Sequence, residues 1–538
     1  MRKFLMAVAI GGLVLLVAAP AMALDFKFGA EYRVRFYDYA NTNFDSDNQI
    51  FRGNPGGVQI RVRPRFDVSD DNGNIQATIR FEYGDTNFGQ GGGANGSAFG
   101  VNGSGGATGN AFSNAGTGNR VGTGSGGSIG TDGVGLETKW AFIDFAMPAN
   151  IPVRVRAGLQ PIYLPKGLIV DDDAAGVRLY GKYGIVSYDA SWYRLATPSR
   201  DANAGNGLIG QPRNDNTKDN NFDWWSAKVD FNIAPWMQAG IYGAYGRNAA
   251  NCTAPNPGFQ TAAAAAAMAQ AGGNYITPIC PTQDRTRDQG WFGLTFTGKV
   301  QTVDYDLDFV YGSAKGGSTG AFSAPANAAA AGVINSSTTA GNQPMTVSGW
   351  VLDGGVHIPI GPFKWNLLGS YATGDGGDGM GQNSGAFPYG PGPSWSGAGG
   401  QYELIGEGGA FDVVSTQNGP TNLWMLGTTL EYVPVKALWL KAAYGFVGFS
   451  KKSGNCANYM TYAAGALAND AGAQCYGPVW YGKPGDNLQG ESTLGQEFHL
   501  RADYTMWTGF KVQGMIGWFI PSNGDVMGKY ILQLLYNF

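Results

Sequence analysis

After its first 23 residues, the chain has no stretch of the ~18 consecutive apolar residues that a membrane-spanning helix needs, yet one two-residue pattern recurs to its end. From Asp25 to Tyr37, apolar side chains occupy every second position and mostly polar ones stand between them. Successive side chains of a β-strand point to opposite faces, so this alternation predicts a strand with one apolar and one polar face. The pattern returns at 58–68 and 75–83, on either side of an Asn72-Gly73 turn that favours a hairpin.

Pro64 lies on the apolar face of the second segment. A proline cannot donate to the strand ladder, so we expect a bulge or local break there. Further strands are predicted near 136–147, 152–162, 175–183, 185–196, 222–234, 236–247, 289–299, 302–312, 346–358, 362–373, 421–433, 437–450, 493–507, 509–519 and 527–538.

These eighteen strands predict an all-β fold, a transmembrane antiparallel up-and-down β-barrel, with sixteen strands as the alternative. An even number is typical of bacterial single-chain barrels, which also alternate short periplasmic turns with long external loops. Short connections at 69–74, 148–151, 299–302, 359–362, 434–436 and near Thr508 follow that alternation. A soluble β-sandwich would show the same period, but it rarely carries so many long strands.

Composition supports the membrane barrel over a soluble enzyme. The chain has 86 glycines among 538 residues, 14% charged residues and 13% aromatics, whereas soluble domains carry about 25% charged residues. Tryptophans near strand ends fit aromatic girdles as a group, with Trp236, Trp439 and Trp507 beside short turns. The formal net charge of -4 gives no indication of nucleic-acid binding.

The N-terminus predicts secretion. Arg2 and Lys3 precede an apolar run and an Ala21-Met22-Ala23 site, so residues 1–23 read as a signal peptide cleaved after Ala23. The barrel would then occupy residues 24–538. An uncleaved membrane anchor is the alternative.

The last strand is the most specific motif, because Tyr530, Leu532, Leu534, Tyr536 and the terminal Phe538 share one face. In this it resembles bacterial outer-membrane β-barrels, whose assembly machinery reads such an end. The segments WAFIDFAMP (140–148), VRVRAGLQPIYLP (153–165) and DDDAAGVRLYGKYG (171–184) resemble the homotrimeric porins of that membrane. The resemblance implies an outer-membrane location in contact with lipid, a homotrimer, and Tyr536 and Phe538 as the assembly signal.

Five long loops are expected near 84–134, 248–288, 313–345, 374–420 and 451–492. The first and fourth are dominated by Gly, Asn and Ser and cannot bury enough apolar surface to order themselves alone. We interpret these loops as a flexible surface coat. The alternative is that one of them folds into the lumen and narrows it.

Four cysteines lie in pairs within two of these loops: Cys252 with Cys280, and Cys456 with Cys475. A secreted protein can form disulfides, and four cysteines allow three connectivities. We expect the two within-loop pairs, which restrict otherwise unordered segments. Metal binding is the rival reading, but no Cys-x-x-Cys spacing supports it.

The polar face of the N-terminal strands is rich in arginine, which binds anionic groups while its stem packs along a wall. We predict that the pore is lined by Arg33, Arg35, Arg61, Arg63, Arg65, Arg80, Arg154 and Arg156, with acidic groups at Asp171, Asp172 and Asp173 and at Asp304, Asp306 and Asp308. In trimeric porins the third external loop opposes an arginine cluster with carboxylates, so the resemblance implies that residues 166–173 line a constriction. The alternative is that the Asp171–Asp173 run only ends a strand and faces water.

No motif for catalysis, a cofactor or a metal is found: the chain lacks a Walker motif, a Gly-x-Ser-x-Gly elbow and a haem-attachment sequence, and it has two histidines, His357 and His499. The sequence therefore predicts a porin rather than an enzyme: a water-filled channel for passive diffusion of small hydrophilic solutes and ions. The alternative is a structural or adhesion barrel, or a sheath for an electron-transfer partner, with no open pore of its own.

Overall fold

The computed structural model describes residues 24–40, 56–87, 136–149, 151–196, 222–248, 287–318, 344–374, 383–384, 387–388, 394–405, 422–451, 461–463, 466–468, 493–522 and 526–538. The predicted signal peptide, all four cysteines and most of the long loops lie outside these residues.

Antiparallel strands make the wall of a barrel. They are β1 (Leu24–Ala40), β2 (Gly56–Asp70), β3 (Ile75–Asn87), β4 (Leu136–Ala146), β5 (Val153–Tyr163), β6 (Asp171–Tyr183), β7 (Val186–Ala196), β8 (Phe222–Ala234), β9 (Met237–Asn248), β10 (Arg287–Val300), β11 (Val303–Ser318), β12 (Pro344–Ile360), β13 (Phe363–Ala372), β15 (Leu423–Val435), β16 (Leu438–Phe449), β19 (Thr493–Trp507), β20 (Phe510–Pro521) and β21 (Met527–Asn537). The sheet has 19 strands when the two-residue β14 (Asn383–Ser384) is included, so eighteen long strands form the wall of the described chain.

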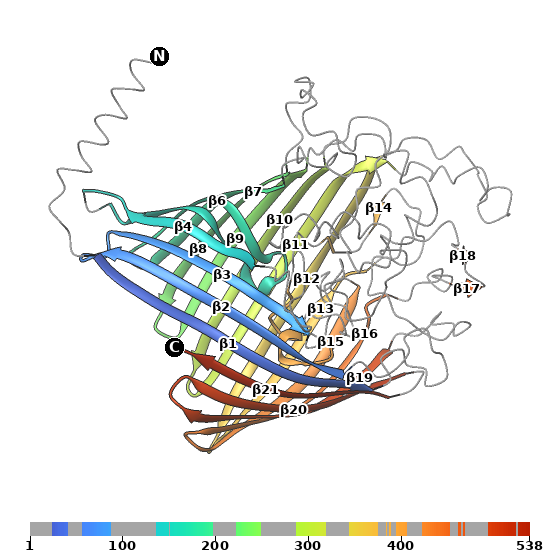
Figure 1. The fold of residues 1–538 in the computed structure, drawn as a ribbon. Helices are drawn as coiled ribbons and strands as arrows, with labels where there is room; N and C mark the ends of the chain where they lie inside the picture. The colour runs from blue at the N-terminus through green and yellow to red at the C-terminus, as the bar shows by residue number, and fades with distance from the viewer. Residues whose placement is uncertain are drawn as a thin grey trace, which may run out of the picture.

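Each wall strand pairs with its neighbour along the chain, and β1 pairs with β21, which closes the sheet. Figure 1 shows this seam, where blue β1 lies beside red β21. The C-terminus completes it: the Phe538 N–H donates to the Ala30 carbonyl (3.1 Å), and the Ala30 N–H donates to the Phe538 carbonyl (3.0 Å). The predicted all-β, antiparallel, eighteen-strand barrel is confirmed.

Pro64 interrupts one of the two ladders of its strand. The register of β1 with β2 runs unbroken through Pro64, which is paired with Ala30. On the other side, the pairing of β2 with β3 passes from Val62–Tyr83 to Arg65–Arg80 with no pair at Arg63 or Pro64, and its register shift lies nearby, between Ile60 and Val62. The predicted local break is therefore present on the β3 side alone.

Trp439 is not a girdle residue, because its indole N–H donates to Glu431 on the inward face (3.1 Å).

The alternating pattern divides the wall into an apolar outer face and a polar inner face. Phe28, Ile143, Phe292 and Leu500 are among the large apolar side chains that stay 41% to 50% exposed. Their neighbours along the same strands, such as Asp144 and His499, are buried. Among the described residues, no helix is long and apolar enough to cross a membrane.

Two segments leave the wall and enter the lumen. β5 pairs with β4 only up to Leu159, and β6 pairs with β7 only from Ala175. The strand residues between 160 and 174 therefore pair with each other and not with a neighbouring wall strand. This hairpin tip, which contains the 3-10 turn η3 (Pro165–Gly167), bends toward β11 (Figure 1). The second segment, which we call the strap, comprises residues 394–405 between β13 and β15 and contains η6 (Gly399–Gln401).

Candidate functional site: the lumen

The arginines predicted to line a pore lie on the inward face of β1 to β5, where most are paired with local carboxylates. Arg61 contacts Glu31 (2.7 Å), Arg65 contacts Asp67 (2.8 Å), and Arg63 forms an ion pair with Glu82. Arg154 and Arg156 share the two oxygens of the buried Asp144, at 2.7 Å and 2.8 Å. The lumen wall is therefore a mixed surface and not a row of unopposed cations.

Three other arginines are held by neutral groups as well. Arg33 donates to Gln59 (3.3 Å) and Arg35 donates to Gln533 across the seam (3.0 Å). The Arg80 guanidinium lies 4.5 Å above the centre of the Trp140 ring, a cation–π contact. Arg33 is buried, whereas the Arg61 and Arg65 side chains keep 16% and 42% of their surface exposed.

The hairpin tip is tied across the lumen by Lys166. Its ammonium group contacts Asp308 (3.1 Å) and Asp353 (3.0 Å) and forms an ion pair with Asp306, so β5–β6 is joined to β11 and β12. Burial lowers the pKa of Lys166, but the Asp353, Asp308 and Asp306 carboxylates raise it further, and the net direction is upward. Lys166 therefore stays charged while it holds the tip.

The apolar part of the tip anchors it. Leu168, Ile169 and Val170 are fully buried, which fixes the tip by packing as well as by charge. Gly167 has a φ of +63°, and a Cβ there would stand 2.0 Å from the Ser394 hydroxyl. Only glycine fits this position, because it both adopts a positive φ and lets the strap approach.

The acidic residues beside the tip differ in position. Asp171 and Asp172 are exposed, while Asp173 accepts a hydrogen bond from the Trp140 indole (2.8 Å). Asp304 contacts Lys299 (3.4 Å) near the short turn that joins β10 to β11. Among the described residues, neither acidic group forms an ion pair with the predicted arginines, so the expected arrangement of opposed charges is replaced by local pairs and by Lys166.

The strap is held by wall carboxylates that accept hydrogen bonds from its backbone. Asp353 accepts from Ala398 N (3.1 Å) and from the Trp395 indole (3.0 Å). Glu497 accepts from the backbone N–H groups of Glu403 (2.8 Å), Leu404 (3.0 Å) and Ile405 (2.7 Å). Hydrogen bonds to an ionised acceptor are stronger than neutral ones, so these two carboxylates define the path of the strap.

Cations and apolar contacts complete its attachment. Lys441 donates to the Gln401 carbonyl (2.6 Å) and Lys529 donates to the Glu403 carbonyl (2.5 Å). The Tyr402 ring fits where Gly427 and Gly445 face each other in register, because a Cβ on either glycine would meet the ring within 2.6 Å. Ser396 N donates to the Lys166 carbonyl (2.7 Å), which joins the strap to the hairpin tip. The surface-coat reading is therefore wrong for residues 394–405.

These attachments bury inward-facing side chains of the wall strands that they contact. On β8 to β19, Trp224, Asp353, Glu497 and His499 are fully buried. On β2, β5 and β6, the Arg63, Arg154 and Arg178 side chains keep 24%, 31% and 33% of their surface. Comparable exposure is found elsewhere on the wall, where the Lys228 (β8), Arg501 (β19) and Lys511 (β20) side chains keep 32%, 30% and 39%. Among the described residues, accessible charged groups therefore include those along β1 to β6 and are not confined to them.

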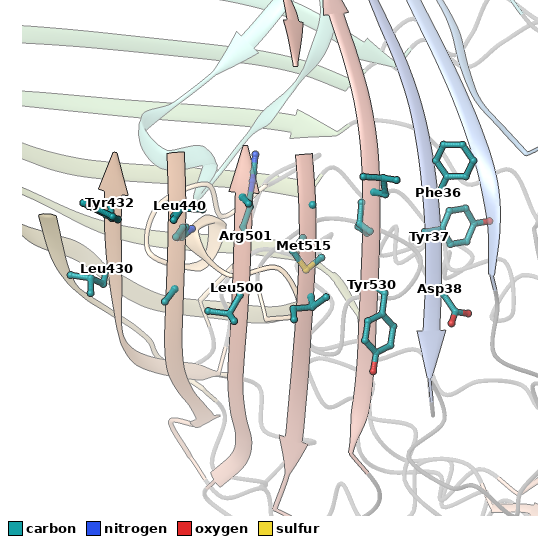
Figure 2. A pocket seen from close by; sticks show the side chains of 17 residues that line it. Phe36, Tyr37, Asp38, Leu430, Tyr432, Leu440, Leu500, Arg501, Met515 and Tyr530 are labelled. Atoms are coloured by element: carbon teal, nitrogen blue, oxygen red, sulfur yellow. The ribbon is translucent and has the colours of Figure 1, made fainter. Parts of the chain in front are cut away.

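A separate apolar groove of about 780 Å³ lies mainly on the outer face. Its lining residues lie on β15, β16, β19, β20, β21 and β1. Figure 2 shows Leu430, Leu500, Tyr530 and Phe36 around it. Small side chains at Ala442, Ala502 and Gly514 create the depression. It belongs to the outer wall and takes no part in the lumen.

Sequence reasoning placed Lys166 near the lumen but missed its partner Asp353, and it missed Glu497, Lys441 and Lys529. The paired glycines Gly427 and Gly445 were the available signal, since two facing gaps on an inner wall leave room for an inserted ring. Among the described residues, no group of three or more His, Cys, Asp or Glu side chains could hold a metal ion. The expected disulfides among Cys252, Cys280, Cys456 and Cys475 lie outside the described residues and stay predictions.

Comparison with known proteins finds similar solved structures only. No family model and no curated protein matches the chain. It is similar to the outer membrane protein opdK from Pseudomonas aeruginosa, with a TM-score of 0.45 and 9% identity over 96% of this chain and 98% of that one. It is also similar to OpdQ from the same organism (TM-score 0.47, 9% identity, 96% and 98% covered) and to OccAB4 from Acinetobacter baumannii (TM-score 0.45, 8% identity, 96% and 99% covered).

Proposed function

We propose that this chain is an outer-membrane channel through which small hydrophilic solutes and ions diffuse passively, without covalent change. The observation that carries the proposal is the contrast between its two wall faces. A closed barrel satisfies its backbone within itself and turns large apolar side chains outward, as lipid requires. Its inner face keeps charged groups partly exposed along β1 to β6.

The path is eccentric. The hairpin tip and the strap occupy the side of the lumen toward β8 to β19, so solutes would pass between these segments and the arginine-bearing wall of β1 to β6. Arg33, Arg35, Arg61, Arg63, Arg65, Arg80, Arg154 and Arg156 would line that path, with Asp171 and Asp172 at its border. Residues 164–170 would narrow it, since they reach across from β5–β6 to β11.

The same features support a proposal for how the protein is exported and assembled. We propose that residues 1–23 direct secretion and that Phe538 and Tyr536 form the end that the barrel-assembly machinery reads. Phe538 remains 54% exposed on the outer face while its backbone closes the seam. We further propose a homotrimer, whose subunits would associate through their apolar outer walls in contact with outer-membrane lipid.

Conductance in planar bilayers tests the channel. In a background with the four native cysteines replaced by serine, Arg63→Cys should give channels whose current changes in steps when a charged, membrane-impermeant thiol reagent is added. Val62→Cys is the matched control, since the adjacent side chain points to the opposite face and should not react from the lumen. A folded barrel that passes no current would overturn the proposal in favour of a structural barrel or a sheath for a partner.

A further inference from the structure

The chain has two histidines, and both face inward on wall strands, but their surroundings differ. His357 on β12 lies between β11 and β13, where its Nε2 is 2.7 Å from Asp306 Oδ1 and its Nδ1 is 2.8 Å from Asn366 Oδ1. Gly355 makes room for the ring, since a Cβ there would stand 3.2 Å from its Nε2 and Cε1. The ring is therefore fixed with both nitrogens against oxygen atoms.

Neither oxygen can donate to the ring. The Asn366 amide nitrogen donates to Thr429 (2.7 Å) and to Glu431 (2.7 Å), so the atom it turns toward His357 is its carbonyl oxygen, which only accepts. Asp306 also forms an ion pair with the Lys166 ammonium, and a cation beside a carboxylate favours its ionised form. Both ring nitrogens must then donate, which is the hydrogen-bonding pattern of an imidazolium.

The charges around the ring favour that state. Asp306 and Asp304 face it from β11, and Asp304 is directly opposite in register, 3.4 Å from Lys299. Asp308 and Asp353 share Lys166 with Asp306, so three carboxylates meet one ammonium group. On the remaining side, Lys364 from β13 stands 4.0 Å from Glu431 of β15. Carboxylates outnumber cations in this group, which stabilises a proton on His357.

We propose that His357 is a titratable switch of lumen charge, doubly protonated at neutral pH and neutral in alkali. As pH rises, loss of one proton removes the hydrogen bond to Asn366 or to Asp306 and makes the group of carboxylates around Lys166 one charge more negative. The His357 side chain keeps 22% of its surface and Asp306 keeps 26%, so this change reaches the lumen. The inference rests on the proposed channel function for its consequence, but not for the protonation itself.

His499 provides an internal reference. Its Nδ1 lies 2.7 Å from Glu497 Oε1, while its fully buried Nε2 has no hydrogen-bond partner. A proton on that nitrogen would be an unsatisfied buried donor, so we expect His499 to be neutral, with its hydrogen on Nδ1. One measurement can therefore compare both rings.

Nitrogen NMR of the refolded, ¹⁵N-histidine-labelled full chain in detergent micelles tests the protonation states. At about pH 7, where an ordinary histidine is mostly neutral, one ring should show two protonated nitrogens, and that signal should be missing from His357→Gln. The second ring should show a neutral tautomer. A neutral His357 ring at that pH would overturn the proposal.

Reversal potentials in a salt gradient test the consequence. As pH rises from about 7 to about 9, wild-type channels should shift toward cation preference, and His357→Gln should abolish the shift, whereas His499→Gln should retain it. Channels that conduct but show equal shifts in wild type and His357→Gln would refute the switch. An imidazolium signal from a barrel that passes no current would instead refute the channel function alone.

Discussion

The strap depends on Glu497, and replacing that side chain separates attachment of the strap from stability of the barrel. Glu497 is fully buried and accepts three strap N–H groups and the His499 ring N–H. In Glu497→Leu, three backbone donors lose their acceptor. A buried donor left unsatisfied costs ~1–3 kcal/mol, so three coupled donors would destabilise the docked strap by roughly 3–9 kcal/mol.

The barrel should survive this loss. Its backbone hydrogen bonds close on themselves from β1 to β21, and no strand pairing of the described residues involves the strap. We therefore expect local release of residues 403–405, with a folded, heat-modifiable barrel of unchanged yield. Glu497→Gln keeps one acceptor oxygen and should give an intermediate effect.

Hydrogen exchange of the amides of residues 403–405 measures the attachment, and single-channel conductance measures the consequence. In Glu497→Leu these amides should exchange faster by several orders of magnitude. The conductance should rise, because the released strap residues no longer occupy their place in the lumen. Glu82→Gln is the control for exchange, since Glu82 is a buried inner-wall carboxylate bonded to Arg63 of β2. Wild-type protection in Glu497→Leu would refute the assignment of Glu497 as the anchor of the strap.

Four further predictions concern topology, assembly, crosslinks and selectivity. A cysteine at Ser97 should be labelled on intact cells and one at Asp71 should not; surface labelling of Asp71→Cys would reverse the orientation. Deleting Phe538 should lower the amount of folded barrel without changing single-channel conductance, and an unchanged yield would argue against an assembly signal. Non-reducing peptide mapping should find Cys252 joined to Cys280 and Cys456 joined to Cys475, and a peptide joining Cys252 to Cys456 would exclude this pairing. Replacing Arg61, Arg63 and Arg65 together by Gln removes the cations nearest to Glu31, Glu82 and Asp67, so the reversal potential should move toward cation preference, most strongly at low salt. No movement at low salt would place these side chains away from the path.

The wall was predictable because its determinants are local. An outer face in contact with lipid needs an apolar residue at every second position, and that period is visible in any ten residues, as in Phe26 to Phe36. Short turns such as Asn72-Gly73 then fix where each strand reverses. Closure could also be expected, because an open edge would leave backbone groups unsatisfied in the membrane.

The filling of the lumen was not predictable, because its contacts join residues that are far apart in sequence. Lys166 meets Asp353 across 187 positions, and Glu403 meets Glu497 across 94. The sequence around one member of such a pair does not indicate which distant residue it contacts. The glycine-rich composition of 374–420 describes most of that loop but not the apolar residues Trp395, Leu404 and Ile405, which bury themselves against the wall.

These contacts also change how selectivity should arise. If acidic and basic groups faced each other across an empty lumen, their field would span the whole path. In the structure, Arg61, Arg63 and Arg65 each have a carboxylate on the same or an adjacent strand, and Asp306 and Asp308 are bound by Lys166. Paired charges cancel within a few ångströms, and salt screens what is left beyond ~10 Å at 0.1 M. Selectivity should therefore follow small local imbalances of charge, and this is why one proton on His357 can alter it.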